Sequence, residues 1–311
     1  MGVIRAASPN DLDAIATMIA RRHARVQGAT RELSPAFTDP AVVRAALADP
    51  PQGWVDVRDG ELLASLLWEE SDDGRAIAGI IGAAGSPEAM ARLYAVAGDE
   101  WMARGLATHV FVVPSVDRPL ADRLVDLSFG REEAYAVRPL GDRGGPRLLT
   151  DIEVDRVGLE HLETVTRLGD LLARHHEGSP VFDRHSNAFY SGLPEEYRRS
   201  VVDEDARVLI ARDRGESVGL LLWRPGAPFP LYDERSAEMI LLAVHPDARG
   251  KQVGRTLVST AMRDMSSFGH TAAIADWRTT NLEASRFWPA QGFLTIANRY
   301  VRTVPERPTA G

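Results

Sequence analysis

The chain repeats one pattern at a spacing of about half its length, and this repeat constrains the possible fold more than any other feature of the sequence. Residues 55–68 read closely against residues 209–223, since each segment holds two apolar runs joined by a charged turn with Gly60 or Gly215. Apolar runs around a glycine-containing turn predict a β-hairpin. Solenoid repeats are about 20 to 50 residues long, so a repeat of this size predicts a duplicated domain.

The similarity between the halves extends to both sides of the hairpin. Residues 3–25 match residues 152–175 as a short strand followed by an amphipathic helix. Residues 129–138 match residues 293–302, and each of these segments is predicted to form the strand that closes its half of the chain. Strands that pair in a hairpin and then alternate with helices indicate a mixed sheet with helices on both faces.

A length of 311 residues also favours two domains. The expected junction is 139–149, where glycine and proline interrupt any regular pattern. We therefore predict two tandem α/β domains, residues 1–140 and 150–303, each a mixed, mostly antiparallel twisted sheet flanked by helices. In the second domain the patterns predict strands at 152–154, 207–212, 217–224, 237–244, 271–277 and 293–302, helices at 158–174, 252–268 and 281–291, and a partly helical stretch at 183–202.

Composition and charge exclude several classes of function. The formal net charge of −8 argues against broad attraction to nucleic acid or to an anionic membrane. The absence of cysteine excludes disulfides, thiolate metal sites and a cysteine nucleophile. No apolar stretch approaches the roughly 20 residues of a membrane span, and the first residues do not resemble a secretory signal. We expect a cytoplasmic protein with no nucleic-acid or membrane partner.

The informative segment of the second half is 237–257, which reads AEMILLAVHPDARGKQVGRTL. An apolar strand is expected to end at Val244, because Pro246 cannot donate a hydrogen bond to a sheet. The turn that follows leads into the predicted helix. The first N–H groups of a helix lack intrahelical partners and concentrate partial positive charge, so a phosphate is stabilised there. Glycines and cations in the turn predict a phosphate site.

This segment resembles the signature of the GNAT acetyltransferase superfamily, in which a strand is followed by Arg/Gln-x-x-Gly-x-Gly/Ala. Arg249 and Gly254 occupy the first and last positions, whereas Gln252 stands where the family commonly has glycine. The resemblance implies acetyl-CoA as the cofactor, with its diphosphate at the helix start. The cofactor-binding residues that it implies in this segment are Leu242, Ala243, Val244, Arg249, Gly250, Lys251, Gln252, Val253, Gly254 and Arg255.

A second segment resembles the same family. Residues 276–293 hold its Asn-x-x-Ala-x-x-aromatic-aromatic pattern, which begins here at Asn281 and ends in Gly-Phe. In that family the Asn caps a helix beside the CoA arm, although a capping Asn suits any helix start. The resemblance adds Asn281, Ser285 and Trp288 to the implied cofactor contacts. We expect Trp288 either to pack against the pantetheine arm or to belong to the core.

The first half keeps the scaffold without these motifs. A strand at 77–82 should precede the equivalent turn, but 83–87 contains no arginine, and the helix within 119–129 has no Asn at its start. We therefore interpret the first half as a degenerate copy that does not hold CoA. The polar run Arg21, Arg22 and His23 on its first helix is interpreted as a solvated face.

Acetyl transfer to an amine needs a positioned carbonyl, a neutral nucleophile and a proton for the leaving thiolate. The resemblance assigns polarisation of the carbonyl to a main-chain N–H at Val244 or His245. It assigns the base to Glu238, which at about 3.3 Å per residue precedes Val244 by about 15 to 20 Å and would act through water or on an extended substrate. A solvated glutamate at the strand edge is an equal alternative.

The acid is less well defined. Many relatives use a tyrosine on the last helix, but this chain has Trp288, whose indole donates a hydrogen bond without delivering a proton. Ser285, Tyr300 and solvent are the candidates for protonating the thiolate.

The acceptor pocket of the family is formed by its first helices, which here correspond to the region of His175, His176 and His185. The resemblance places the substrate-binding residues of this chain at His176, Phe182 and Tyr190. Surface histidines are the alternative interpretation. Adjacent histidines cannot share one helix face and no third ligand stands at regular spacing, so no metal site is expected.

The sequence thus predicts an acetyl-CoA-dependent N-acetyltransferase that modifies a primary amine of a small molecule or peptide, as a monomer or homodimer. The tandem layout also resembles mycothiol synthase. Gln252, Trp288 and the decayed first half favour an alternative, a non-catalytic acyl-CoA-binding or scaffold protein. A dinucleotide-binding fold is disfavoured because no Gly-x-Gly-x-x-Gly follows any predicted strand.

Overall fold

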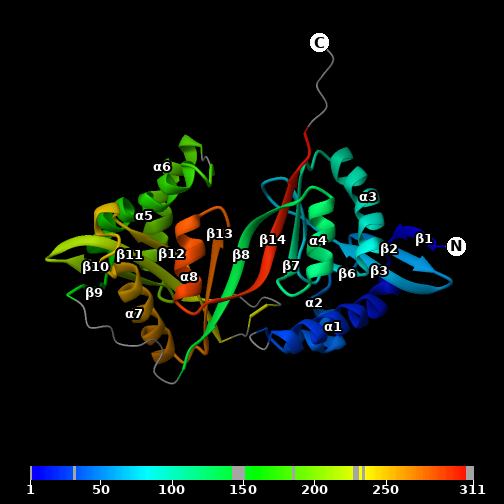
Figure 1. Cartoon of the computed structure of the whole chain (residues 1–311), viewed down its shortest axis with the longest axis horizontal. Coiled ribbons are helices and arrows are strands. Elements are labelled where there is room, and N and C mark those ends of the chain that lie inside the picture. Colours follow the sequence, from blue (N-terminus) through cyan, green and yellow to red (C-terminus); the bar gives the residue numbers. More distant parts are fainter. Residues whose placement is uncertain are drawn as a thin grey trace, which may run out of the picture. The chain divides into compact units, whose positions relative to one another are not determined.

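The computed structural model describes residues 2–30, 33–141, 151–183, 186–226, 231–232 and 235–305. Its contacts divide the chain into two units, and the division does not follow chain order. One unit contains the chain as far as Tyr135 together with the residues from Thr295 onward, and the other is Ala136–Leu294. The last strand, drawn in red in Figure 1, lies beside β7 of the first unit.

The first unit combines four helices and the strands of two sheets among its described residues. Its helices are α1 (Leu12–Ala29), α2 (Pro40–Ala46), α3 (Pro87–Ala103) and α4 (Arg118–Asp126). Its strands are β1 (Gly2–Ala6), β2 (Gly53–Arg58), β3 (Glu61–Leu67), β4 (Glu69–Glu70), β5 (Arg75–Ala78), β6 (Ala83–Gly85), β7 (Thr108–Pro114), the first part of β8 (Gly130–Pro139) and β14 (Leu294–Thr303) from its second residue. One sheet has the order β1–β2–β3–β6, and the other contains the run β4–β5–β7–β14.

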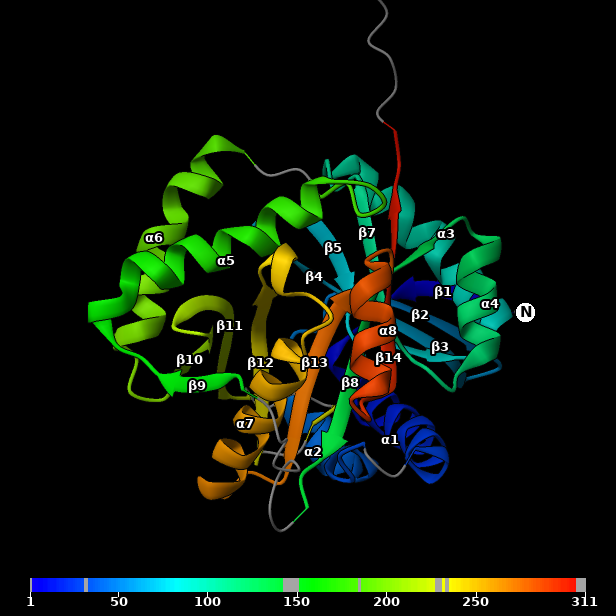
Figure 2. The same ribbon diagram turned by 60° about the vertical axis from the view of Figure 1, so that its left-hand side comes forward.

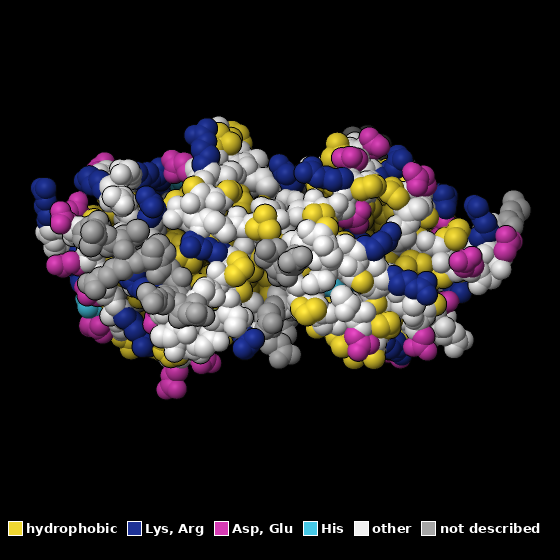
Figure 3. Space-filling model, turned by 60° about the horizontal axis from the view of Figure 1, so that its bottom comes forward, with side chains coloured by type: hydrophobic (Ala, Val, Ile, Leu, Met, Phe, Trp, Pro, Cys, Tyr) yellow, Lys and Arg dark blue, Asp and Glu magenta, His cyan; other side chains and the backbone are white. Residues whose placement is uncertain are grey.

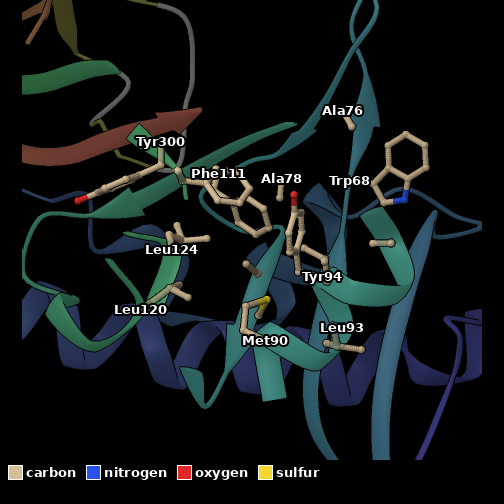
Figure 4. Packing of buried hydrophobic residues seen from close by; sticks show 14 of the residues in the cluster. Trp68, Ala76, Ala78, Met90, Leu93, Tyr94, Phe111, Leu120, Leu124 and Tyr300 are labelled. Atoms are coloured by element: carbon tan, nitrogen blue, oxygen red, sulfur yellow. The ribbon is translucent and has the colours of Figure 1, made fainter. Parts of the chain in front are cut away.

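An aromatic cluster forms much of the first unit's core. Trp101 and Phe111 are almost completely buried, and Tyr94 meets both rings edge-on, at 5.8 and 6.0 Å between centroids. Figure 4 shows Tyr94 of α3, Phe111 of β7 and Tyr300 of β14 in this cluster. The last strand therefore contributes to the hydrophobic core of the first unit.

The second unit is a mixed sheet between helices. Its strands are the end of β8, β9 (Glu153–Arg156), β10 (Arg207–Asp213), β11 (Glu216–Pro225), β12 (Ser236–Val244) and β13 (Ala272–Arg278). Strands β9 to β12 are antiparallel in sequence order, and β13 runs parallel to β12. Its helices are α5 (Leu162–Glu177), α6 (Asn187–Val202), α7 (Val253–Ser267) and α8 (Leu282–Ala290). Each predicted element is found within four residues of its predicted bounds, which confirms the predicted fold class.

Adjacent residues of β11 show that α5 and α7 cover opposite faces of this sheet. Leu220 packs in one cluster with Val165 and Leu168 of α5. The backbone of Gly219 instead lies so close to Val253 and Leu257 of α7 that a methyl group there would come within 3 Å of both side chains. Successive side chains of a strand point to opposite faces, so the two helices lie on different sides. Figure 2 shows α5 crossing β11 and β12, with α8 beside β13.

The duplicated hairpins agree in detail. Asp59 and Gly60 both have positive φ in the β2–β3 turn, at 52° and 84°, and Arg214 and Gly215 have the same two values in the β10–β11 turn. Two successive residues with positive φ are typical of the type I′ turn, whose twist matches that of the paired strands. The two hairpins thus share the same turn geometry.

One predicted surface is wrong. Arg22 and His23 were expected on a solvated face, but each side chain is 7% exposed. Arg22 donates to the carbonyl oxygens of Ile80 and Ala83 at 3.1 and 2.8 Å, and His23 contacts the carbonyl of Ser34 at 2.7 Å. Both buried side chains form hydrogen bonds with carbonyl oxygens outside α1, which the pattern of the helix alone cannot reveal. In the part of the chain that the structure describes, no helix has the length and apolar character needed to span a membrane.

Candidate active site

Two neighbouring strands of the second unit, β12 and β13, separate after a short paired stretch. Within the described residues they pair only as far as Glu238 opposite Ile274. A bulge follows in β12, where Ile240 has no partner in the register with β11. A bulge bends a strand and increases its twist. Residues 241–244 therefore diverge from β13 and open a gap between two parallel strands.

The backbone of β12 beyond the bulge presents hydrogen-bonding groups to this gap. The N–H of His245 donates to the carbonyl of Val218 at 2.8 Å, on the β11 side. N–H groups of successive residues point to opposite edges of a strand, so Leu242 and Val244 direct theirs toward the side that β13 has left. The N–H of His245 is therefore used in pairing with β11, whereas the N–H of Val244 faces the gap.

The turn after β12 ends in an uncapped helix start. A single 3-10 turn, η4 (Pro246–Ala248), follows the strand, and α7 begins at Val253. Gln252 precedes the helix with a left-handed φ of 65°, and its side chain makes no capping hydrogen bond. The N–H of Thr256 donates to the carbonyl of Gln252 at 2.9 Å, which closes the first turn. The N–H groups within that turn remain available to a ligand.

The conformation of Gln252 explains why the family commonly has glycine at this position. Glycine adopts positive φ without a steric penalty, whereas other residues lose roughly 1 to 2 kcal/mol. Gly250, in the same turn, also has a positive φ of 78°. The turn therefore keeps its left-handed geometry with Gln252, at a cost in stability.

Three cations surround this helix start. Arg249 forms an ion pair with Glu283 of α8 at 2.7 Å, and Lys251 lies 3.6 Å from Asp213. Arg255 makes no ion pair with any residue that the structure describes. On the face of the molecule drawn in Figure 3, Lys and Arg side chains intermingle with Asp and Glu. At the start of α7 itself, Arg249 and Lys251 each lie beside a carboxylate, so the charge of these two cations is partly balanced.

The start of α8 lies against the start of α7. The ring of Phe287 is so near Gly254 that a methyl group on this glycine would lie 3.3 Å from the ring. The same added group would lie 3.7 Å from Val244, at the end of β12. The two motifs found in the sequence thus meet at the open end of the gap, and the ion pair between Arg249 and Glu283 joins them from outside.

Asn281 caps α8 and contacts a predicted acceptor residue. Its side-chain oxygen accepts from the N–H of Ala284 at 3.1 Å. Because this oxygen is used as the cap, the amide nitrogen faces Nε2 of His176, 3.3 Å away, and can only donate to it. His176, at the end of α5, is thereby brought to the helix that carries the second motif.

Ser285 and Trp288 are held by other side chains. The Ser285 hydroxyl donates to the carbonyl of Thr279 at 3.1 Å and accepts from the indole N–H of Trp277 at 3.2 Å. Trp288 is 5% exposed and packs edge-on against Phe293, with 5.0 Å between ring centroids. The Ser285 proton is therefore engaged with a carbonyl, and Trp288 occupies the core.

The loop after α5 is fastened to the end of β13. Asp183 accepts from Arg278 at 2.8 Å, and its N–H donates to the carbonyl of His176 at 2.8 Å. Phe182, next to Asp183, has a φ of 54° and a side chain that is 61% exposed. His176 and Phe182 thus lie near the ends of β13 and α5, and His185 lies outside the described residues.

Tyr190 stands apart from this group on α6. The guanidinium of Arg174 lies over its ring, 5.5 Å from the centroid. Partial burial of the hydroxyl and the nearby carboxylate of Glu177 raise the pKa of Tyr190 to about 12. The phenol therefore stays protonated at neutral pH and can donate a hydrogen bond, but it does not act as a base there.

Glu238 lies on the closed side of the gap. It belongs to the last pair that joins β12 to β13, and its carboxylate is 3.8 Å from Arg224 of β11. Its side chain is 31% exposed, so water reaches it. Sequence reasoning missed Arg224, Arg278 and Asp183, because each acts through a partner on a different element and no local pattern marks such pairs.

A sheet whose parallel strands diverge beside an uncapped, cationic helix start defines a fold with a place for a phosphate-bearing cofactor. Residues 173–293 match the family model described as the acetyltransferase (GNAT) family. Over these residues the second half of the chain is similar to the GNAT family, whose fold generally binds acyl-CoA. No curated protein gives a significant match to the sequence.

Solved structures with a similar fold include one tandem protein. The GCN5-related N-acetyltransferase from Sphaerobacter thermophilus is similar, with 16% identity, a TM-score of 0.61 and coverage of 98% of this chain and 97% of that one. A tandem GNAT protein from the clavulanic acid biosynthesis pathway has 14% identity, a TM-score of 0.51 and coverage of 99% and 100%. A glucosamine N-acetyltransferase region of a fungal multi-domain β-N-acetylglucosaminidase has 15% identity, a TM-score of 0.57 and coverage of 97% and 38%. At these identities the likeness concerns the fold.

Proposed function

We propose that the second unit binds acetyl-CoA in the gap between β12 and β13 and transfers its acetyl group to a primary amine of a small molecule or peptide. One observation carries the proposal. The unpaired edge of β12 ends directly at a helix start that has no cap, a left-handed turn at Gln252 and cations at Arg249 and Lys251. The gap supplies strand-like partners for a pantetheine amide, and the helix start supplies N–H donors for its diphosphate.

In this proposal the cofactor is bound mainly by main-chain groups. The first N–H groups of α7, beside Gly254, would hold the diphosphate, and Arg249 and Arg255 would add charge. Leu242 and Val244 would line the pantetheine arm, and the N–H of Val244 would polarise the thioester carbonyl. Such a donor is effective because it is already oriented before charge develops on the oxygen.

The proton transfers are assigned by what each side chain is free to do. We propose that Glu238 takes the proton of the acceptor ammonium. Because Glu238 lies on the closed side of the gap, away from its open end, the proton would pass through intervening water. The Ser285 hydroxyl donates to a carbonyl, and Tyr300 belongs to the core of the first unit. The thiolate therefore receives its proton from solvent. His176, Phe182 and Tyr190 are proposed to contact the acceptor.

The burial of Trp288 favours a second candidate, a CoA-binding protein without turnover. The residue at this position cannot deliver a proton, and the nearest hydroxyl on α8 is already engaged. Both candidates require the same cofactor site and differ only in chemistry. Release of free thiol from acetyl-CoA in the presence of a panel of primary amines distinguishes them.

Calorimetric titration of the full chain with acetyl-CoA tests the cofactor site. Replacing Arg249→Ala removes a charge-assisted contact worth about 1.5 kcal/mol, so we expect affinity to fall about tenfold. Arg198→Ala is the matched control, because Arg198 is also exposed and paired with a glutamate, Glu195, at 2.7 Å. Equal affinities for both variants, or no binding by the parent chain, would refute the proposed site.

A further inference from the structure

The last strands of the two halves are equivalent in sequence, and the structure does not leave each in its own half. Residues 129–138 and 293–302 are the matching segments of the repeat, and they form β8 and β14. From Thr295 onward, β14 belongs to the first unit, whereas β8 passes into the second unit at Ala136. Each half therefore ends in a strand that completes the other unit.

Backbone pairing fixes β14 in the first unit. It runs antiparallel to β7 over seven residue pairs, from Ala297 opposite Pro114 to Thr303 opposite Thr108. The ladder is extended past its end, where the N–H of Val304 donates to the carbonyl of Ala107 at 2.8 Å. A strand held over this length is an integral part of the sheet.

Side chains reinforce the attachment of β14. Arg299 forms ion pairs with Glu132 and Glu133 at 2.7 and 2.8 Å, and its side chain is only 22% exposed. Arg302 lies over the ring of Tyr94 and donates to its hydroxyl at 3.4 Å. Tyr94 is also 2.8 Å from Nδ1 of His109, so β14 is tied to a buried polar group of the first unit.

Contacts in the opposite direction attach the end of β8 to the second unit. The N–H of Leu140 donates to the carbonyl of Thr271 at 2.8 Å, directly before β13, and β8 is the sheet neighbour of β13. Arg138 donates to the carbonyl of Gln291 and packs against Gly292, which has a φ of 81°. The strand from the first half thus borders the strand that carries Trp277 and Arg278.

We propose that the two halves exchange their closing strands, and that the first half is retained because it supplies the strand bordering β13 and receives β14 in return. The first half has lost the cofactor motif, yet it cannot be removed without leaving both sheets incomplete. An open sheet edge beside β13 would expose unpaired backbone groups next to the gap. The chain is then the fused equivalent of a strand-exchanged dimer. This inference does not depend on acetyl transfer.

Hydrogen exchange on the full chain tests the exchange with a matched pair of variants. Val137 in β8 and Val301 in β14 occupy equivalent positions of the repeat. We expect Val301→Ala to accelerate amide exchange in β7 and α3 about tenfold or more, with little change in β12 and α7. Val137→Ala should instead accelerate amide exchange in β13, with little change in β7 and α3. If each variant instead loosens its own half of the sequence, the proposal is overturned.

Cleavage of the folded chain gives a second test that requires no destabilising variant. A protease site is placed within residues 142–149 and cut after purification. We expect the fragments to co-elute in native buffer and to separate only under conditions that unfold both sheets, because each fragment holds a strand of the other's sheet. Fragments that separate natively while each keeps its circular dichroism spectrum would overturn the proposal.

Discussion

The helices α3 and α7 follow equivalent strands in the two units, but the N–H groups at their starts differ in their hydrogen-bond partners. In the first unit, the Ser86 hydroxyl accepts from the N–H of Ala89 at 3.2 Å, Pro87 has no N–H, and Glu88 adds negative charge to the first turn of α3. In the second unit, α7 has no cap and follows a left-handed turn at Gln252. The first helix is complete by itself, whereas the second leaves donors for a ligand.

The strands before these helices show the same contrast. In the first unit, the break between β5 and β6 is filled by Arg22, which donates to the carbonyls of Ile80 and Ala83 and to Asp117 at 3.0 Å. In the second unit, the divergence of β12 from β13 leaves the N–H of Val244 facing the gap. One copy has closed its gap with its own side chain, and the other has kept it open.

The largest expected effect removes this closure. Arg22→Ala leaves the Asp117 carboxylate and two buried carbonyls without their partner, and we expect the free energy of unfolding to fall by about 3 kcal/mol. Arg21→Ala is the control, since Arg21 is the exposed neighbour on the same helix. Urea denaturation followed by tryptophan fluorescence measures both. A loss below about 1 kcal/mol for Arg22→Ala would mean that the gap of the first unit does not depend on this side chain.

A bulky residue at the start of α7 should make its N–H groups as inaccessible to a ligand as those at the start of α3. Gly254→Val places branched carbon where one methyl already comes within 3.3 Å of Phe287 and obstructs the approach to the first-turn N–H groups. We expect acetyl-CoA affinity to fall about thirtyfold, or about 2 kcal/mol. Glu88→Val, at the equivalent position of α3, should leave affinity unchanged. Calorimetric titration decides, and a Gly254→Val chain that binds like the parent would count against a main-chain phosphate site.

Relief of the left-handed turn is a smaller effect of opposite sign. Gln252→Gly removes a side chain from a residue with a φ of 65°, so we expect the free energy of unfolding to rise by about 1 kcal/mol. Gln291→Gly provides the control, because Gln291 also flanks a helix but has a φ of −87° and should gain nothing. Thermal unfolding of both variants measures the difference. Equal shifts would show that the φ of Gln252 stores no strain.

The parts of the molecule that sequence could predict are those fixed by nearby residues. The cap at Asn281, the presence of the two hairpins and the helix start near Val253 depend on a few neighbouring positions, and all were predicted. The burial of Arg22 and the placement of β14 depend on partners about sixty to two hundred residues away. A periodic pattern states that a strand exists, but it does not state which edge the strand joins.

The smallest expected effect is a pH dependence of stability that arises from the first unit. Burial is the main reason that the pKa values of His23 and His109, both in the first unit, lie below the usual 6.5. Below pH 6.5 the unfolded chain therefore binds more protons than the folded one, and stability falls as pH decreases. Between pH 7.5 and 6 each histidine contributes at most about 1 kcal/mol. His23→Gln should reduce this loss in urea denaturation monitored at both pH values, whereas replacement of the exposed Arg21 by Gln should not. A pH dependence that is identical in the His23→Gln chain would show that this imidazole titrates alike in the folded and unfolded states, so that its burial in the first unit would contribute nothing to the loss of stability at low pH.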